Sequence, residues 1–164
     1  MRFAAPVWQN VKTMPKQLGL VFQQRLEQAE AALNAITEQQ AAVSFRPGGW
    51  LRKDVLGHLL DSAINNHQRF VRAALDGHYE GPGYQQEAWV RLHGYGALSW
   101  AALLNSWRDR NAMLARIVER IEEQCLHAQC KVGDHDPVTL EFLIEDYLRH
   151  LEHHVCQITG EAQS

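Results

Sequence analysis

The chain has 164 residues, 46% of them hydrophobic and 21% charged, and 16 basic against 19 acidic residues give a net charge of -3. This composition is typical of one soluble globular domain covering residues 1–164, and the lack of a basic excess argues against a nucleic-acid-binding protein. No apolar run approaches the ~20 residues that cross a bilayer, and the N-terminal segment does not read as a secretory signal. Three cysteines form no framework pattern, so we expect reduced thiols and a cytoplasmic location.

Glycine and proline divide the chain into four segments with helical periodicity. The predicted helices span about residues 14–40, 50–76, 100–125 and 137–159. The sequence RPGG breaks the chain after the first segment, and GHYEGPGY ends the second. Asp136 is the predicted N-cap of the last helix, with Pro137 in its first turn. Because no segment alternates with period two, the sequence predicts an all-α domain, a four-helix bundle.

The lengths of the links indicate how the helices are connected. The first and third links have about ten residues each and suit antiparallel neighbours. The middle link, about 77–98, is roughly twice as long and, at ~3.3 Å per residue, can cross the whole bundle, with a helical turn possible in EAWVRLH. This long crossover favours an up-down-down-up bundle over the simple up-down-up-down arrangement.

Three histidines crowd the segment DYLRHLEHHVCQI near the C-terminus. On a helical wheel His150 and His154 lie together on one flank of the apolar face, whereas His153 points toward solvent. A pair at i and i+4 can bind one ion with both imidazoles from the same side. We therefore expect His150 and His154 to be metal ligands and His153 to be a surface residue.

A third ligand must come from another helix, and the candidates are His58 and His67 in the second predicted helix. If that helix and the last one run antiparallel, His58 is level with the C-terminal pair; if they run parallel, His67 is level instead. The long crossover favours the antiparallel case. His67 lies on the broad apolar face, where histidines usually belong to the core or to a dimer interface.

His58 shares its stripe of the helix with four polar residues, Asp54, Asp61, Asn65 and Arg69. This stripe is either a solvated surface or the lining of a polar pocket. In a pocket, Asp54 and Asp61 are placed to hold the second ring nitrogen of His58, and Asp146 to hold that of His150. Such carboxylates fix the tautomer and orientation of metal-binding imidazoles.

The segments WLRKDVLGHLLDSAINNHQRFVRA and TLEFLIEDYLRHLEHHVCQI, with GYQQEAWVRLHGYGALSW between them, resemble the DinB/YfiT-like superfamily of metal-dependent enzymes. The resemblance covers most of the chain from Trp50 onward. It implies an up-down-down-up four-helix bundle, often a homodimer, in which His58, His150 and His154 hold a divalent metal. Leu51 stands where the family commonly has Ser or Thr, so the second helix must be capped differently here.

Three imidazoles leave an ion such as Zn²⁺ or Ni²⁺ with open positions for a water or a thiol. Characterised members of the superfamily act with bacillithiol or mycothiol, so the resemblance implies a thiol S-transferase or hydrolase acting on a small molecule, with a low-molecular-weight thiol as cofactor. Asp61 is the candidate general base, Arg69 a candidate anchor for an anionic group, and Gln86 and Trp89 candidate roof residues. The alternatives are a non-catalytic bundle that binds metal or senses a ligand, and an interaction protein whose histidines are incidental.

Overall fold

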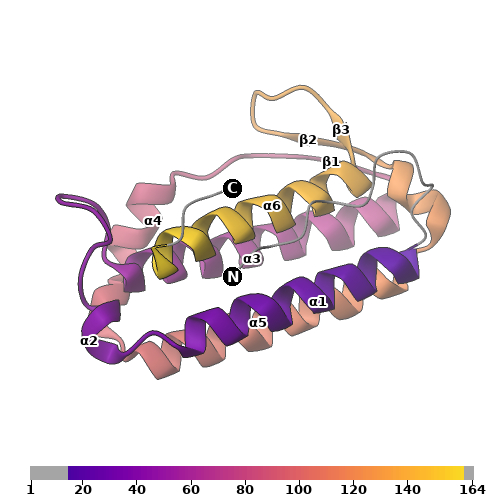
Figure 1. Cartoon of the computed structure of the whole chain (residues 1–164). Helices are drawn as coiled ribbons and strands as arrows, with labels where there is room; N and C mark the ends of the chain where they lie inside the picture. The colour runs from indigo at the N-terminus through magenta and orange to yellow at the C-terminus, as the bar shows by residue number, and fades with distance from the viewer. Residues whose placement is uncertain (1–14, 161–164) are drawn as a thin grey trace.

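Four long helices form the bundle in the computed structural model, which describes residues 15–160. They are α1 (Pro15–Asn34), α3 (Arg52–Asp76), α5 (Trp100–Arg120) and α6 (Leu140–Thr159). Helices α1 and α6 run in one direction and α3 and α5 in the other (Figure 1), which confirms the up-down-down-up prediction. Helix α1 packs against α5 and α6, and α3 packs against the same two helices. The chain-successive helices α1 and α3 are therefore antiparallel but diagonal, not the neighbours that the short link predicted.

Each long helix buries one apolar face, and the fully buried side chains include Phe22, Phe70, Trp107 and Ile144, one from each of the four helices. Burial of these faces is what holds amphipathic helices together in water. Among the helices of residues 15–160, none combines the length and the apolar character that crossing a membrane requires.

Helix α1 ends at Asn34, short of the predicted residue 40, and a separate turn of helix, α2 (Glu38–Ala41), follows it. The reason is a local capping box at Thr37. The Thr37 hydroxyl accepts from the Gln40 N–H at 3.2 Å, and the Gln40 side-chain oxygen accepts from the Thr37 N–H at 2.8 Å. This pattern starts a new helix instead of continuing the old one. Met14, the predicted start of the apolar stripe, lies outside the described residues.

The link between α3 and α5 runs back along the bundle from the end of α3 to the start of α5 (Figure 1). Gly77 ends α3 with a φ of +75°, a left-handed conformation that glycine adopts without strain. The link contains α4 (Gln86–His93), where EAWVRLH predicted a helical turn, and a 3₁₀ turn, η1 (Tyr95–Ala97). The crossover thus places α4 beside the start of α3.

A small sheet, which the sequence did not predict, covers the other end of the bundle. It consists of β1 (His78–Gly81), β2 (Gln129–Val132) and β3 (Val138–Thr139), with β1 parallel to β2 and β2 antiparallel to β3. Strands of four, four and two residues are too short for an alternating pattern to be recognised. The sequence analysis missed these strands, and the predicted four-helix bundle is confirmed.

The boundaries of the last two helices also differ from the prediction. Helix α5 ends at Arg120, because Ile121 has extended backbone, and Cys125 lies in a separate 3₁₀ turn, η2 (Glu123–His127). Helix α6 is capped by Thr139, whose hydroxyl accepts from the Phe142 N–H at 3.1 Å. The prediction that Asp136 is the N-cap was wrong, because residues 138–139 belong to the sheet and the helix begins only after them.

Candidate metal centre

Three histidine side chains converge between α3 and α6. The Nε2 atoms of His58 and His150 lie 3.0 Å apart, and those of His150 and His154 lie 3.1 Å apart. One nitrogen from each ring lies within 4.8 Å of the others. The structure therefore brings together the three histidines that the sequence singled out, with His58 rather than His67 as the member from the earlier helix.

A hydrogen bond between the two helices sets this register. Arg52, the first residue of α3, donates from Nε to the carbonyl of Ile158 near the end of α6, at 2.7 Å. His58 follows Arg52 by six residues and His154 precedes Ile158 by four. Because the helices are antiparallel, both histidines lie between one and two turns from the tied ends. His58 therefore lies level with His150 and His154, as the antiparallel arrangement predicted.

The environment keeps the cluster uncharged. Burial, followed by the nearby His154, lowers the pKa of His58 to about 4. Burial and the neighbouring histidines lower the pKa of His150 to about 3. The pKa of His154 is also lowered, mainly by burial, while its bond to Gln157 acts in the opposite direction. Neutral imidazoles are the form in which histidine binds metal ions.

The residues present fit a divalent ion. Gln157 Oε1, which can only accept, lies 2.8 Å from His154 Nδ1, so that nitrogen carries the proton and Nε2 presents its lone pair to the cluster. Two nitrogens bound to one ion at about 2.0–2.1 Å are separated by about 3 Å or slightly more, which matches the two short separations. Gln157, three residues after His154, was missed by the sequence analysis, although i and i+3 spacing on a helix is a usable signal.

Aromatic side chains enclose the cluster on the crossover side. The ring centroids of Trp50 and Tyr84 lie 5.5 Å and 6.5 Å from that of His58. Trp89 packs on Tyr84 at 5.0 Å. Burial, with the nearby Asp61, raises the pKa of Tyr84 to about 12, so its hydroxyl stays protonated at neutral pH. These rings exclude water from one side of His58.

Asp61 is fully buried but does not hold His58, contrary to the prediction. Its Oδ1 accepts from the Tyr95 hydroxyl at 2.7 Å and lies 3.1 Å from His93 Nδ1. Burial raises its pKa, while Tyr95 and His93 act in the opposite direction. Gly57 permits this arrangement, because a Cβ there would lie 1.9 Å from Tyr95 Cδ2. The cluster of Asp61, His93 and Tyr95 was missed, since two of its members come from the irregular crossover.

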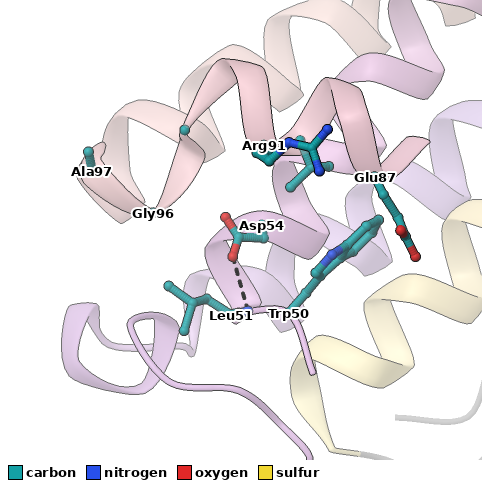
Figure 2. A pocket seen from close by; sticks show the side chains of 9 residues that line it. Trp50, Leu51, Asp54, Glu87, Arg91, Gly96 and Ala97 are labelled. Carbon is teal, nitrogen blue, oxygen red and sulfur yellow. Dashed lines mark hydrogen bonds between the residues drawn. The ribbon is translucent and has the colours of Figure 1, made fainter. Parts of the chain in front are cut away.

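Asp54 lies in a separate surface hollow of about 420 Å³ between the start of α3 and α4, shown in Figure 2. There its carboxylate accepts from the Leu51 N–H at 3.2 Å, which caps α3 in place of a Ser or Thr side chain. The other predicted carboxylate, Asp146, is exposed and bonds to Arg149 at 3.2 Å. The Nδ1 atoms of His58 and His150 are buried and have no partner among the described residues. Neither aspartate therefore plays the predicted orienting role.

His67 and His153, the two other histidines considered as ligands, lie outside the cluster. His153 is exposed, as predicted, and its Nε2 lies 2.7 Å from Gln157 Nε2. His67 is half-buried on α3. Gln157 therefore contacts both His153 and His154, and it links the surface histidine to the buried ones.

A cavity of about 820 Å³ opens beside the cluster and is lined by His150. Its walls on α3 are Ser62, Asn66 and Arg69, and those on α6 include Phe142, Leu143, Asp146 and Tyr147. Gln86 lines it from the crossover, as predicted, whereas Trp89 reaches it only through Tyr84. Of the polar stripe of α3, Arg69 lines this cavity, Asp61 is buried outside it and Asp54 lines the separate hollow, so the stripe is not a plain solvated surface.

Comparison with known proteins gives consistent results. A family model described as the DinB superfamily matches residues 22–158. The "Putative metal-dependent hydrolase YfiT" of Bacillus subtilis (strain 168) is 26% identical over 136 residues, covering 78% of this chain and 72% of that protein. The solved structure of YfiT, described as having "an unusual four-helix bundle topology", has a TM-score of 0.81 at 22% identity over 96% of this chain and 90% of that one. A mycothiol-dependent maleylpyruvate isomerase has a TM-score of 0.75 at 13% identity over 93% of this chain and 63% of that one.

Proposed function

The chain belongs to the DinB superfamily, and we propose that it is an enzyme that uses one divalent metal ion to act on a small molecule. The observation that carries the proposal is the convergence of three neutral imidazoles beside a cavity large enough for a substrate. In this proposal His58, His150 and His154 hold the ion through their Nε2 atoms, and Zn²⁺ or Ni²⁺ suits such a set.

A divalent ion held by three imidazoles acidifies a water or a thiol in its open position, which supplies a nucleophile at neutral pH. The reaction is therefore hydrolysis or transfer of a low-molecular-weight thiol. Hydrolysis is supported by the name of the relative YfiT, and thiol transfer by the mycothiol dependence of the structurally similar isomerase. The protein's own side chains orient the ligand set through Gln157 and exclude water through Trp50 and Tyr84.

A second candidate is a bundle that binds a metal or a ligand without turnover. It is supported by Asp61, the candidate base, whose Oδ1 is occupied by Tyr95 and His93. Localisation in the cytoplasm and assembly as a homodimer are further parts of the proposal, as implied by the sequence and by the family respectively.

Assays that separate these possibilities use metal-loaded protein with two kinds of substrate. p-Nitrophenyl esters report hydrolysis, and monobromobimane with added cysteine reports thiol transfer. We expect turnover in one of the two assays, abolished by a chelator and by His150→Ala. A lack of turnover by protein that holds one metal per chain would favour the non-catalytic bundle.

A further inference from the structure

Arg69 on α3 is a buried cation that forms no ion pair with any residue that the structure describes. Its exposed fraction is 8%, and its one side-chain hydrogen bond to the described residues is the weak contact from Nη1 to Asn66 Oδ1 at 3.4 Å. Within residues 15–160 no carboxylate forms an ion pair with its guanidinium. A guanidinium has five donors in a planar fork that matches a carboxylate, and a buried charge is costly unless it is paired. The guanidinium therefore lacks the anion that normally compensates for the burial of an arginine.

Arg69 faces the same cavity as the histidine cluster. Both Arg69 and His150 line the cavity of about 820 Å³, with Ser62 and Asn66 between them on the α3 wall. A molecule in this space can touch the guanidinium and the metal centre at once. The unpaired donors of Arg69 are thus presented to a ligand and not to the apolar core.

The length of the cavity follows from the helices. Asn66, which the guanidinium reaches back to contact, follows His58 by eight residues, or about 12 Å along α3. On the antiparallel α6, Phe142 precedes His150 by eight residues and lines the far end of the same cavity, again about 12 Å away. The cationic end and the histidine end are therefore about two helical turns apart.

The polarity of the walls differs between the far end and the rim. Asn66 and Arg69 are buried donors, and Val132, Val138 and Leu143 supply apolar surface. The aspartates that line the cavity, Asp134, Asp136 and Asp146, are exposed to solvent. Their charges are screened by water and disfavour an anion at the mouth, whereas the buried guanidinium is screened much less. One anionic group seated inside the cavity, on an otherwise uncharged body, is the best match.

We propose that this cavity binds an elongated small molecule whose carboxylate pairs with Arg69 while its other end reaches the three-histidine cluster. The inference rests on the proposed function only for the reacting end, because the carboxylate site needs Arg69 alone. It assigns Arg69 a binding and positioning role and names the substrate class as monocarboxylates with a chain of about six atoms between the two ends.

The first test uses metal-free protein and so does not depend on the proposed function. Hexanoate and 1-hexanol are titrated by calorimetry into the wild-type protein, Arg69→Gln and the control Arg72→Gln, which alters an exposed arginine on the same helix. We expect hexanoate to bind the wild type and the control about tenfold or more tighter than the alcohol, as for a charge-assisted pair, and this preference to disappear in Arg69→Gln. An unchanged preference in Arg69→Gln, or none in the wild type, would overturn the proposal.

The second test uses metal-loaded protein and measures whether a ligand spans the distance from Arg69 to the histidine cluster. 6-Mercaptohexanoate and 3-mercaptopropionate are titrated into metal-loaded protein, and we expect the longer acid to bind at least about tenfold tighter because only it spans both ends. Equal affinities would overturn the stated length. Melting temperatures show whether Arg69→Gln is folded. If it is not, Arg69→Lys replaces it, because lysine keeps the charge but lacks the planar donors of the guanidinium, and we expect it to bind hexanoate with intermediate affinity. Wild-type affinity in Arg69→Lys would contradict the pairing.

Discussion

His58 Nε2 and His150 Nε2 lie 3.0 Å apart although 92 residues separate them in the chain. The long crossover makes α3 and α6 antiparallel, and the bond from Arg52 to Ile158 fixes their relative height. The candidate metal centre is thus a consequence of bundle topology, and each part of that account can be tested separately.

Gln157 is expected to tune the affinity of the cluster for metal. Gln157→Leu removes the oxygen that accepts from His154 Nδ1, and the tautomer of the His154 ring is then no longer fixed. We expect metal affinity to fall about 10- to 100-fold, measured by competition with a chromophoric chelator. Gln68→Leu, at an exposed position of α3, should leave the affinity unchanged. Equal affinities for both variants would show that Gln157 has no orienting role.

Substitutions of Thr139 and Asp136 test which of the two residues caps the start of α6. Thr139→Ala removes the hydroxyl that accepts from the Phe142 N–H and should lower the free energy of unfolding by about 1 kcal/mol. Asp136→Ala, at an exposed residue outside the helix, should change it by less than about 0.5 kcal/mol. Urea denaturation measures both free energies of unfolding. A larger loss in Asp136→Ala than in Thr139→Ala would indicate that Asp136 is the cap.

Gly57 is expected to tolerate no side chain. Gly57→Ala drives a methyl group into Tyr95, which must move away from Asp61, and we expect a loss of about 1–3 kcal/mol in the free energy of unfolding. Gly83→Ala is the control, because a Cβ there meets nothing within 4 Å. In a Tyr95→Ala background the Gly57→Ala change should cost clearly less, and simple additivity of the two losses would argue against the contact.

The metal-free protein is expected to lose stability in acid. Burial, with the nearby His154, lowers the pKa of His58 to about 4 in the folded state, below its ordinary value of 6.5, so as the pH falls below 6.5 the unfolded state takes up a proton first. The contribution of His58 to the free energy of unfolding is therefore fully present above pH 6.5. It is lost as the pH falls to about 4, at up to about 1.4 kcal/mol per pH unit. Urea melts at several pH values should show a shallower slope for His58→Gln, and an unchanged slope would contradict the assigned burial.

Much of the site could be predicted because it depends on regular structure. The i and i+4 pair of His150 and His154 follows from helical periodicity, and the length of the crossover selected His58 over His67. The partners of Asp61 could not be predicted, because Tyr95 and His93 reach it from a turn and a short helix whose positions no periodic pattern encodes. The three strands were missed for a related reason, since each is too short to show an alternation.

The burial of the polar stripe also lay beyond the sequence. Asp61 and Arg69 have the spacing of a surface stripe, but Tyr95 of the crossover covers Asp61, and residues of the crossover and the sheet enclose the cavity that Arg69 lines. A helical wheel describes one helix and carries no information about what covers it.

Metal content of the purified protein and its histidine variants tests the central claim most directly. We expect one divalent ion per chain in the wild type, none in His58→Ala, His150→Ala and His154→Ala, and full occupancy in His67→Ala and His153→Ala, measured by inductively coupled plasma mass spectrometry. Full occupancy in His58→Ala, or loss in His67→Ala, would contradict the assigned ligand set.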